Sequence, residues 1–302
     1  MSQPSLWEML SHWRFDPFWI VLLIVAAWWY ISALRKLEAT NPRVPHPRWK
    51  MWSFIGGLVL IAIATMSPMQ HYGNVFLFMT FVGFIVISMV APIFLLLASP
   101  LTLAFRTTDT QRGRARLRWL YRNPISTVLT YPLFSWLAFA VVTYVWQFSK
   151  LTEIAARNGA VRDIELLTML FIGILFYFPA LCADPVRWRM NFPLRIFYVF
   201  VEVTHKALFG GMFTSMSSVF HPSMAKAMPS WGPDPLFDQR IGVLIVSAVG
   251  NAIFITVIAF LVARWVPYET RVSARTDKRL EKERAAAERK QAALEQVFRR
   301  TV

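Results

Sequence analysis

Residues 75–99 of the chain, VFLFMTFVGFIVISMVAPIFLLLAS, contain no charged side chain. About 20 predominantly apolar residues in a helix cross the hydrocarbon core of a bilayer. A helix is expected because it satisfies its own backbone hydrogen bonds, for which lipid offers no partner. The stretch therefore predicts a membrane-spanning helix, and the whole chain fits that class: 56% of its residues are hydrophobic, 16% are charged and the mean hydropathy is +0.44.

Six further stretches of the same character lie on either side of it. They cover about residues 18–34, 52–67, 127–148, 164–181, 194–216 and 241–266. Together the seven stretches predict an all-α integral membrane protein, a bundle of seven transmembrane helices. The second and fifth are short, so their ends are the least sharply defined.

Basic residues fall on alternate loops, which predicts the orientation of the bundle. The loops near residues 35–50, 106–122 and 187–195 are rich in lysine and arginine, and so is the segment after the seventh stretch. The remaining loops carry few basic residues, and acidic residues dilute them. Since short loops rich in lysine and arginine stay in the cytoplasm, we expect the N-terminus outside and the C-terminus inside.

The net charge of +15 is explained by these same loops. Anionic lipid head groups attract such basic segments, so membrane lipids are the expected partners and no nucleic acid is required. The first apolar stretch is expected to be a retained helix, because no small-residue cleavage site follows it. The only cysteine, Cys182, offers neither a disulfide framework nor a paired-thiol metal site.

The composition changes abruptly after Pro267, which divides the chain into a membrane domain, 1–266, and a tail, 267–302. Charged residues, alanine and glutamine dominate residues 271–300 without proline or glycine, and oppositely charged residues recur at helical spacing. This pattern predicts a basic, charged cytoplasmic helix. It is either a solvated extension or a docking helix for a partner.

Three ionisable residues lie inside the sixth stretch, where a charge is expensive. At 3.6 residues per turn, Glu202, His205 and Lys206 share one helix face. We expect Glu202 to pair with Lys206, with His205 hydrogen-bonded nearby. The cluster is either a functional polar site facing the bundle interior or a structural ion pair.

Methionine and histidine gather on the side predicted to face outward. Thioether and imidazole together suit Cu(I), a soft ion, although methionine is also ordinary packing material. The candidate metal ligands come from the end of the second stretch and from the end of the sixth: Met66, Met69, His71, Met212, Met216 and His221.

Several motifs resemble the bacterial CtaG family of cytochrome c oxidase assembly factors. Residues 89–92 (MVAP) and 95–103 (LLLASPLTL) resemble that family's third span, and residues 123–124 (NP), 176–179 (FYFP) and 184–185 (DP) resemble later landmarks. The outer loop 231–242, WGPDPLFDQRIG, is the most specific match, with Trp231, Gly232, Asp238 and Gln239 at the positions of the family's Trp-Gly and Pro-Leu-x-Asp-Gln element. The resemblance covers about residues 50–265.

The resemblance implies a bacterial inner-membrane protein that helps to insert copper into a haem–copper oxidase, with oxidase subunits as partners. The chain departs from the family where the family carries histidine. A His-Met-x-x-His motif is replaced by residues 80–84 (TFVGF), Trp-His by residues 146–147 (WQ), and His-x-x-Glu-His by residues 162–166 (RDIEL), so all the motif histidines are absent and only Glu165 of the last motif is retained. Threonine, phenylalanine, arginine and leucine cannot replace imidazole as copper ligands.

Two interpretations of these departures remain open. Either this chain has abandoned the family's metal site and acts as a scaffold or partner subunit, which is simpler, or it uses the methionine–histidine set instead. Both are forms of an oxidase assembly factor that catalyses no reaction. The alternatives are a partner subunit of another membrane complex, bound through the tail, and a transport protein in which the Glu202–His205–Lys206 cluster lines a route for protons or metal ions. An enzyme is disfavoured because carboxylates at loop ends usually cap helices or pair with arginine.

Overall fold

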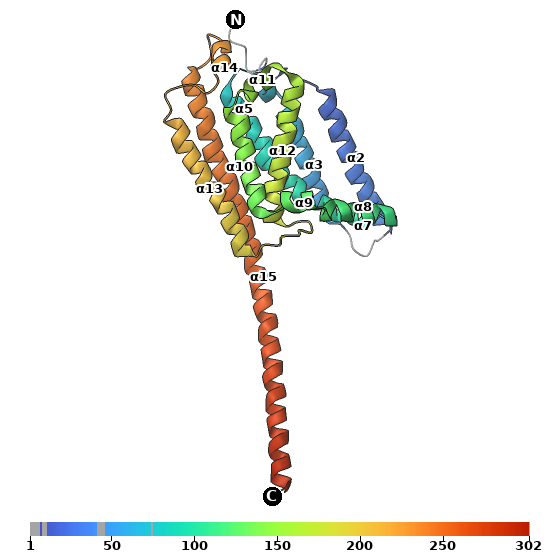
Figure 1. The fold of residues 1–302 in the computed structure, drawn as a ribbon. Coiled ribbons are helices and arrows are strands. Elements are labelled where there is room, and N and C mark those ends of the chain that lie inside the picture. The colour runs from blue at the N-terminus through green and yellow to red at the C-terminus, as the bar shows by residue number, and fades with distance from the viewer. Residues whose placement is uncertain (1–6, 8–10, 41–45, 74, 302) are drawn as a thin grey trace. The chain divides into compact units, whose positions relative to one another are not determined.

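The structure, a computed structural model, describes residues 7, 11–40, 46–73 and 75–301, apart from the side chains of His71 and of residues 288–301. Every regular element in this part of the chain is helical. The chain divides into two units, Met1–Val257 and Ile258–Val302, and each is described by itself. The first unit is a helical bundle (Figure 1).

Six helices of the described chain are long and apolar enough to cross a membrane. They are α2 (Pro17–Thr40), α3 (Arg48–Met66) with its extension to Gln70, the helical run Leu77–Thr107, α12 (Gly159–Leu181), α13 (Phe192–Thr214) and the apolar part of α15 (Pro235–Thr301). The helical class predicted from sequence is therefore confirmed.

The predicted fourth span is a broken element. A short helix, α9 (Pro124–Leu129), precedes α10 (Pro132–Phe148), and α10 meets α11 (Leu151–Arg157) at a bend of 63°. The number of spans is seven if this bent pair is one span, and six otherwise. Pro132 starts α10, as proline commonly does at the first helical position.

The run that begins at Leu77 changes its helical register halfway. It consists of α5 (Leu77–Phe84), a π-helical turn η1 (Ile85–Val90), α6 (Ala91–Leu97) and α7 (Pro100–Thr107). Pro92 explains the wide turn, because its ring has no N–H and clashes with the carbonyl of Ser88 four residues earlier. A side chain at Gly173 of α12 would collide with that same carbonyl, so glycine permits α12 to approach η1.

At the end of the bundle that carries α7 (Figure 1), a buried carboxylate fixes the start of that helix. Asp184 accepts hydrogen bonds from the backbone N–H groups of Leu101 (3.1 Å) and Thr102 (2.7 Å). Ser99, just before α7, has a left-handed backbone with φ 54°. Two of the motif segments noted above, 95–103 and 184–185, therefore meet in one packing site.

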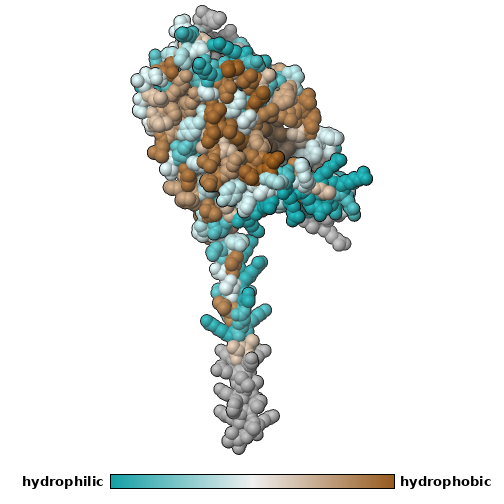
Figure 2. All heavy atoms as spheres, viewed as in Figure 1, coloured by the Kyte–Doolittle hydropathy of each residue, from teal (hydrophilic) through white to brown (hydrophobic). Residues whose placement is uncertain are grey.

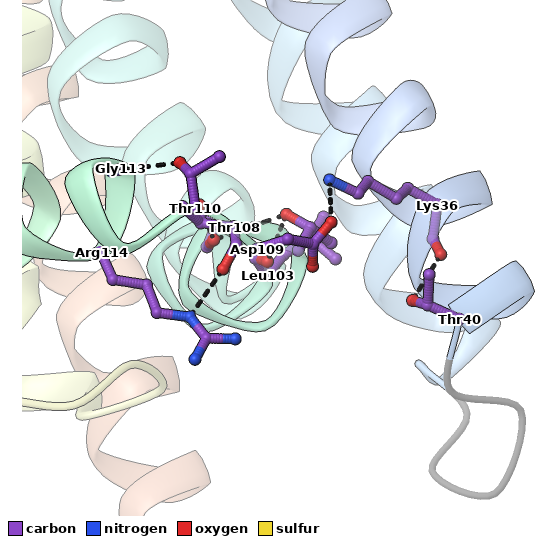
Figure 3. Close-up of polar contacts among 10 residues, drawn as sticks. Lys36, Thr40, Leu103, Thr108, Asp109, Thr110, Gly113 and Arg114 are labelled. Carbon is purple, nitrogen blue, oxygen red and sulfur yellow. Dashed lines mark hydrogen bonds and ion pairs between the residues drawn. The ribbon is translucent and has the colours of Figure 1, made fainter.

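A second helix lies across the same end. The helix α8 (Gln111–Arg122) begins with Thr110, whose hydroxyl accepts a hydrogen bond from Gly113 N–H at 3.2 Å. Lys36 of α2 pairs with Asp109 at 2.6 Å, and Arg114 donates to the Thr108 carbonyl at 2.8 Å (Figure 3). Because both partners of the ion pair are exposed, it contributes little stability.

At the opposite end, the residues before the last span anchor a long loop. The loop contains α14 (Pro222–Ala227). Asp238 accepts a hydrogen bond from Leu77 N–H at 2.7 Å, and Gln239 accepts one from Phe220 N–H at 2.7 Å. Both side chains are buried, so the Asp-Gln element ties the start of α15 to the start of α5 and to the loop.

The side of the bundle is apolar, as lipid contact requires. Large apolar residues of α2, among them Val21, Ile24 and Trp28, are exposed. Figure 2 shows apolar atoms over much of the side of the bundle and hydrophilic atoms towards its ends. Exposed apolar surface of this extent marks a membrane interface rather than a soluble domain.

The second unit is the C-terminal part of α15. Helix α15 runs without interruption from Pro235 to Thr301 and contains Pro267. Trp265 donates to Glu269 at 3.1 Å, and Arg279 pairs with Glu283 at 2.8 Å, both at i,i+4 spacing that supports an exposed helix. The composition boundary predicted at 266/267 lies inside this unit and inside the same helix.

Candidate functional site

An internal cavity of about 40 Å³ lies among α5, η1, α10, α11 and α12. That volume is enough to hold water. Seven of the lining residues come from the three segments at which the CtaG resemblance expects histidine motifs: Thr80, Gly83, Phe84, Gln147, Arg162, Glu165 and Leu166. The fold therefore brings together three segments that are far apart in the sequence, and they enclose one site.

The chemistry of the lining is that of oxygen donors and a guanidinium group. Arg162 is buried and donates to the carbonyl oxygens of Ala156 (3.3 Å) and Ala155 (3.5 Å). Thr80 Oγ1 donates to the Gly73 carbonyl at 2.7 Å. In the part of the chain that the structure describes, the buried Oε1 of Gln147 has no hydrogen-bond partner, so the lining offers an acceptor to a molecule in the cavity.

This lining does not fit Cu(I). A soft ion is held by thiolate, thioether and imidazole ligands, whereas Gln147, Thr80 and Glu165 offer oxygen. Met79 and Met169 also line the cavity and supply two thioethers. The permanent positive charge of Arg162 lies in the same lining as the Glu165 carboxyl, so the lining has no net negative charge to attract a cation.

A buried ion pair lies on α13, where the sequence predicts it. Glu202 Oε1 is 3.7 Å from Lys206 Nζ and 3.1 Å from His205 Nδ1. Glu202 and Lys206 are essentially inaccessible, with 0% and 1% of their side chains exposed. His205 Nε2 is in turn hydrogen-bonded to the Tyr144 hydroxyl at 2.8 Å, so the cluster extends from α13 to α10.

Aromatic rings surround the ammonium group of Lys206. Its Nζ lies 5.5 Å from the ring centroids of Phe84, Phe139 and Phe209, which come from α5, α10 and α13. A desolvated cation–π contact contributes about 2 kcal/mol or more. Phe84 also lines the cavity, so its ring contacts both the cavity and the buried ammonium group.

Several buried polar atoms on the helices around the ion pair lack a hydrogen-bond partner among the described residues. They are Glu202 Oε2, Thr143 Oγ1, Tyr177 Oη and Asn251 Oδ1. Such atoms usually find water or a ligand. The interior next to Glu202 therefore has unused capacity to hydrogen-bond water or a ligand.

The predicted methionine–histidine set is divided between different environments. Met66 is buried at the end of α3, whereas Met212 and Met216 are exposed. His221 is buried, with Nε2 2.9 Å from the Gln147 carbonyl and Nδ1 4.0 Å from Glu153. Met69 is partly exposed on α4 (Pro68–Tyr72), and the side chain of His71 lies outside the described part of the chain.

No three histidine, cysteine or acidic side chains of the described residues converge as a metal site. The proposed use of Met66, Met69, His71, Met212, Met216 and His221 as copper ligands stays a prediction.

The remaining motif residues hold the loop before α15 in place. The ring of Trp231 packs on Phe76 with centroids 5.6 Å apart, and a side chain at Gly232 would press on Met228 and Phe76 at 3.1 Å. With the Asp238 and Gln239 contacts described above, these residues position the loop that contains α14.

Two contacts of the interior carry no sequence signal of their own. The arrangement of Phe139, Phe209 and Phe84 around Lys206 depends on how three helices pack. His46, in a loop bracketed by prolines, is buried, with Nε2 3.0 Å from the Tyr30 hydroxyl. This contact makes His46 part of the packing between α2 and the residues before α3.

Comparison with known proteins agrees with this geometry. The family model described as cytochrome c oxidase caa3 assembly factor (Caa3_CtaG) matches residues 28–267. Uncharacterized proteins of Mycobacterium bovis and Mycobacterium tuberculosis are each 26% identical to the chain over 282 residues, and one of Mycobacterium leprae is 24% identical. The match covers 91% of this chain and 42% of each relative, so the chain spans about two fifths of their length.

No solved structure matches the chain. The family match covers far more than half of the sequence and includes all three segments that line the cavity. The chain belongs to the cytochrome c oxidase caa3 assembly factor (Caa3_CtaG) family.

Proposed function

We propose that this protein acts in the bacterial cytoplasmic membrane as an assembly factor for a haem–copper oxidase, and that it does so without holding copper at the family-motif cavity. Its partners are then subunits of the oxidase, and it catalyses no reaction. Family membership and the apolar helices support the role in assembly. The single observation that carries the second part is the cavity lining of Thr80, Gln147 and Arg162.

The proposal follows from ligand chemistry. A copper carrier needs soft ligands that bind Cu(I) and then release it. A guanidinium group in the lining, with oxygen atoms as its neighbours, opposes the entry of a cation and favours a water-filled, hydrogen-bonded interior. A bundle that keeps the fold and loses the ligands is suited to hold oxidase subunits while they mature.

The orientation of the chain in the membrane is part of the same proposal. We place the N-terminus outside and the C-terminus in the cytoplasm, because the loops near residues 35–50, 106–122 and 187–195 are basic. A reporter fused after Val302 should then be active only if it functions in the cytoplasm.

Deletion of the gene tests the role in assembly. We expect the deletion to lower the level of assembled oxidase, measured by the haem absorbance of membranes and by oxidase subunit levels, and the intact chain to restore it. Copper added to the medium separates the two interpretations. A scaffold cannot be replaced by extra copper, whereas a copper carrier can. Unchanged oxidase levels in the deletion strain would contradict the role in assembly.

The buried cluster of Glu202, His205 and Lys206 favours a second candidate function, transfer of protons or metal ions across the bundle. Ionisable residues within a membrane often mark ion pathways, and the free Oε2 of Glu202 offers a binding position. The measurement is proton or metal-ion flux into proteoliposomes, with Glu202→Gln as the test and the exposed Glu283→Gln as control. Flux that survives Glu202→Gln would exclude this candidate.

A further inference from the structure

A groove of about 730 Å³ opens between α10 and α13, near the loop that joins α12 to α13. Its wall is formed by apolar residues of the two helices, chiefly Leu133, Leu194, Phe197 and Val201. Leu133 and Phe197 are each more than half exposed. In a membrane-spanning bundle such a wall faces lipid chains.

The mouth of the groove is cationic. Arg187, Trp188 and Arg189 line it, and no acidic side chain does so in the described part of the chain. Asp184, the nearest acidic residue along the loop, is buried and is engaged by Leu101 and Thr102. The guanidinium groups at the mouth are therefore not neutralised by a carboxylate lining the same groove.

The mouth is held in place by contacts to α9 and to Tyr131, the residue before α10. Arg187 Nη1 donates to Thr127 Oγ1 at 2.6 Å, and Trp188 Nε1 donates to the Thr127 carbonyl at 3.0 Å. The ring of Trp188 meets Tyr131 edge to face at 5.2 Å. Since Arg187 and Trp188 are both tied to Thr127, the loop presents its positive charge at a defined position above the apolar wall.

We propose that this groove binds an anionic glycerophospholipid, with its phosphate at Arg187 and Arg189 and an acyl chain along Leu133, Leu194 and Phe197. Arginine forms charge-assisted, forked hydrogen bonds with phosphate. Only an occupant with an anionic head and an apolar chain matches both the mouth and the wall. The volume is within the range of about 300–1,000 Å³ that is usual for ligand sites.

The floor of the groove gives the lipid a structural role. Trp136 lines the groove, and its ring packs edge to face on His205 at 5.7 Å. Tyr198 also lines it and donates to the Phe176 carbonyl at 3.1 Å. An acyl chain in the groove therefore covers Trp136, whose ring contacts His205, the histidine bonded to Glu202. The inference is independent of the proposed role in oxidase assembly.

The test uses the full chain purified in detergent and titrated with phosphatidylglycerol, phosphatidylcholine or inorganic phosphate. Retained lipid is counted by native mass spectrometry, and stabilisation is followed by thermal unfolding, because a ligand that binds only the folded state raises its stability. We expect saturable binding of one phosphatidylglycerol with roughly tenfold preference over phosphatidylcholine, the order of one charge-assisted contact. Inorganic phosphate alone should not stabilise the protein.

Variants locate the site. Arg189→Gln, whose side chain is exposed, should lower the affinity for phosphatidylglycerol about tenfold, and Arg189→Lys should retain most of it. Arg116→Gln on α8, also exposed, removes the same charge away from the groove and should leave the affinity unchanged. Size-exclusion chromatography identifies variants that do not fold. If Arg189→Gln is one of them, the affinity of Arg189→Lys for phosphatidylglycerol is compared with that of the intact chain instead.

Three results would overturn the inference. The first is equal affinity of the intact chain for phosphatidylglycerol and phosphatidylcholine. The second is an equal loss of phosphatidylglycerol affinity in Arg189→Gln and Arg116→Gln. The third is stabilisation by inorganic phosphate as large as that by phosphatidylglycerol. The first denies a charge-selective head-group site, the second denies its location, and the third denies that the apolar wall takes part.

Discussion

Removing Lys206 is the most informative perturbation of the bundle. In Lys206→Met the side chain keeps most of its length and its contacts with Phe84, Phe139 and Phe209, but the ammonium group is lost. Glu202, with 0% of its side chain exposed, then keeps its contact with His205 at 3.1 Å. A carboxylate in that position has lost its strongest partner and cannot be reached by bulk water.

The size of the effect follows from the burial. Breaking a buried ion pair by removing one partner destabilises a protein by about 3–5 kcal/mol, whereas replacing both partners with apolar residues is often neutral. The contact of Glu202 with His205 at 3.1 Å offsets part of the loss, so we expect about 3 kcal/mol. At about 2–4 °C per kcal/mol, the midpoint of thermal unfolding should fall by roughly 6–12 °C.

The assay is thermal unfolding of purified protein in one detergent, followed by tryptophan fluorescence. The set comprises wild type, Lys206→Met, Glu202→Leu, the double variant and the exposed Lys150→Met as a matched control. The double variant should lie within about 1 kcal/mol of wild type, because both charges leave the interior together. A midpoint of Lys206→Met close to that of the control, or a double variant as unstable as the single, would refute the ion-pair reasoning.

Three further outcomes are expected. Burial lowers the pKa of His46 below its ordinary 6.5, so the unfolded chain binds the proton more readily than the folded chain. The stability of the fold should therefore decrease as the pH drops below about 6.5. A pH series of thermal unfolding midpoints should show this decrease, and His46→Gln should make it smaller. Gly173→Ala should destabilise the fold by about 1–3 kcal/mol, the usual range for overpacking, because the added methyl group meets the Ser88 carbonyl. An unfolding midpoint equal to that of wild type would mean that α12 can shift away from η1. Chelator competition should show a gain of Cu(I) affinity when imidazole is returned to the cavity by combining Thr80→His, Phe84→His, Gln147→His and Arg162→His; no gain would show that the cavity geometry itself excludes copper.

Hydropathy alone predicts most of the fold. Residues 75–99 overlap one of the helices able to span the membrane, Leu77–Thr107, and five of the other six predicted stretches also match such a helix to within two residues at each end that they overrun. The fourth stretch is not one continuous helix, because α9 ends at Leu129 and α10 begins at Pro132. Beyond the stretch, α10 bends by 63° into α11. A composition window that stops at residue 148 contains neither the bend nor the short helix after it.

Less of the candidate site than of the fold could be predicted from the sequence. Helical spacing places Glu202, His205 and Lys206 on one face, and the structure brings their polar atoms together. The cavity depends on how α5, α10 and α12 pack, which local periodicity does not specify. The CtaG resemblance marked the three segments, but only the tertiary fold shows that Gln147 and Arg162 face the same space.

The most direct test of the central claim is a Cu(I) titration of the purified full chain against a chromogenic Cu(I) chelator. We predict that the chelator keeps its copper, because oxygen atoms and the Arg162 guanidinium line the cavity where ligands would be needed. Stoichiometric removal of one Cu(I) per chain, abolished by Met79→Leu or Met169→Leu at the cavity, would contradict it.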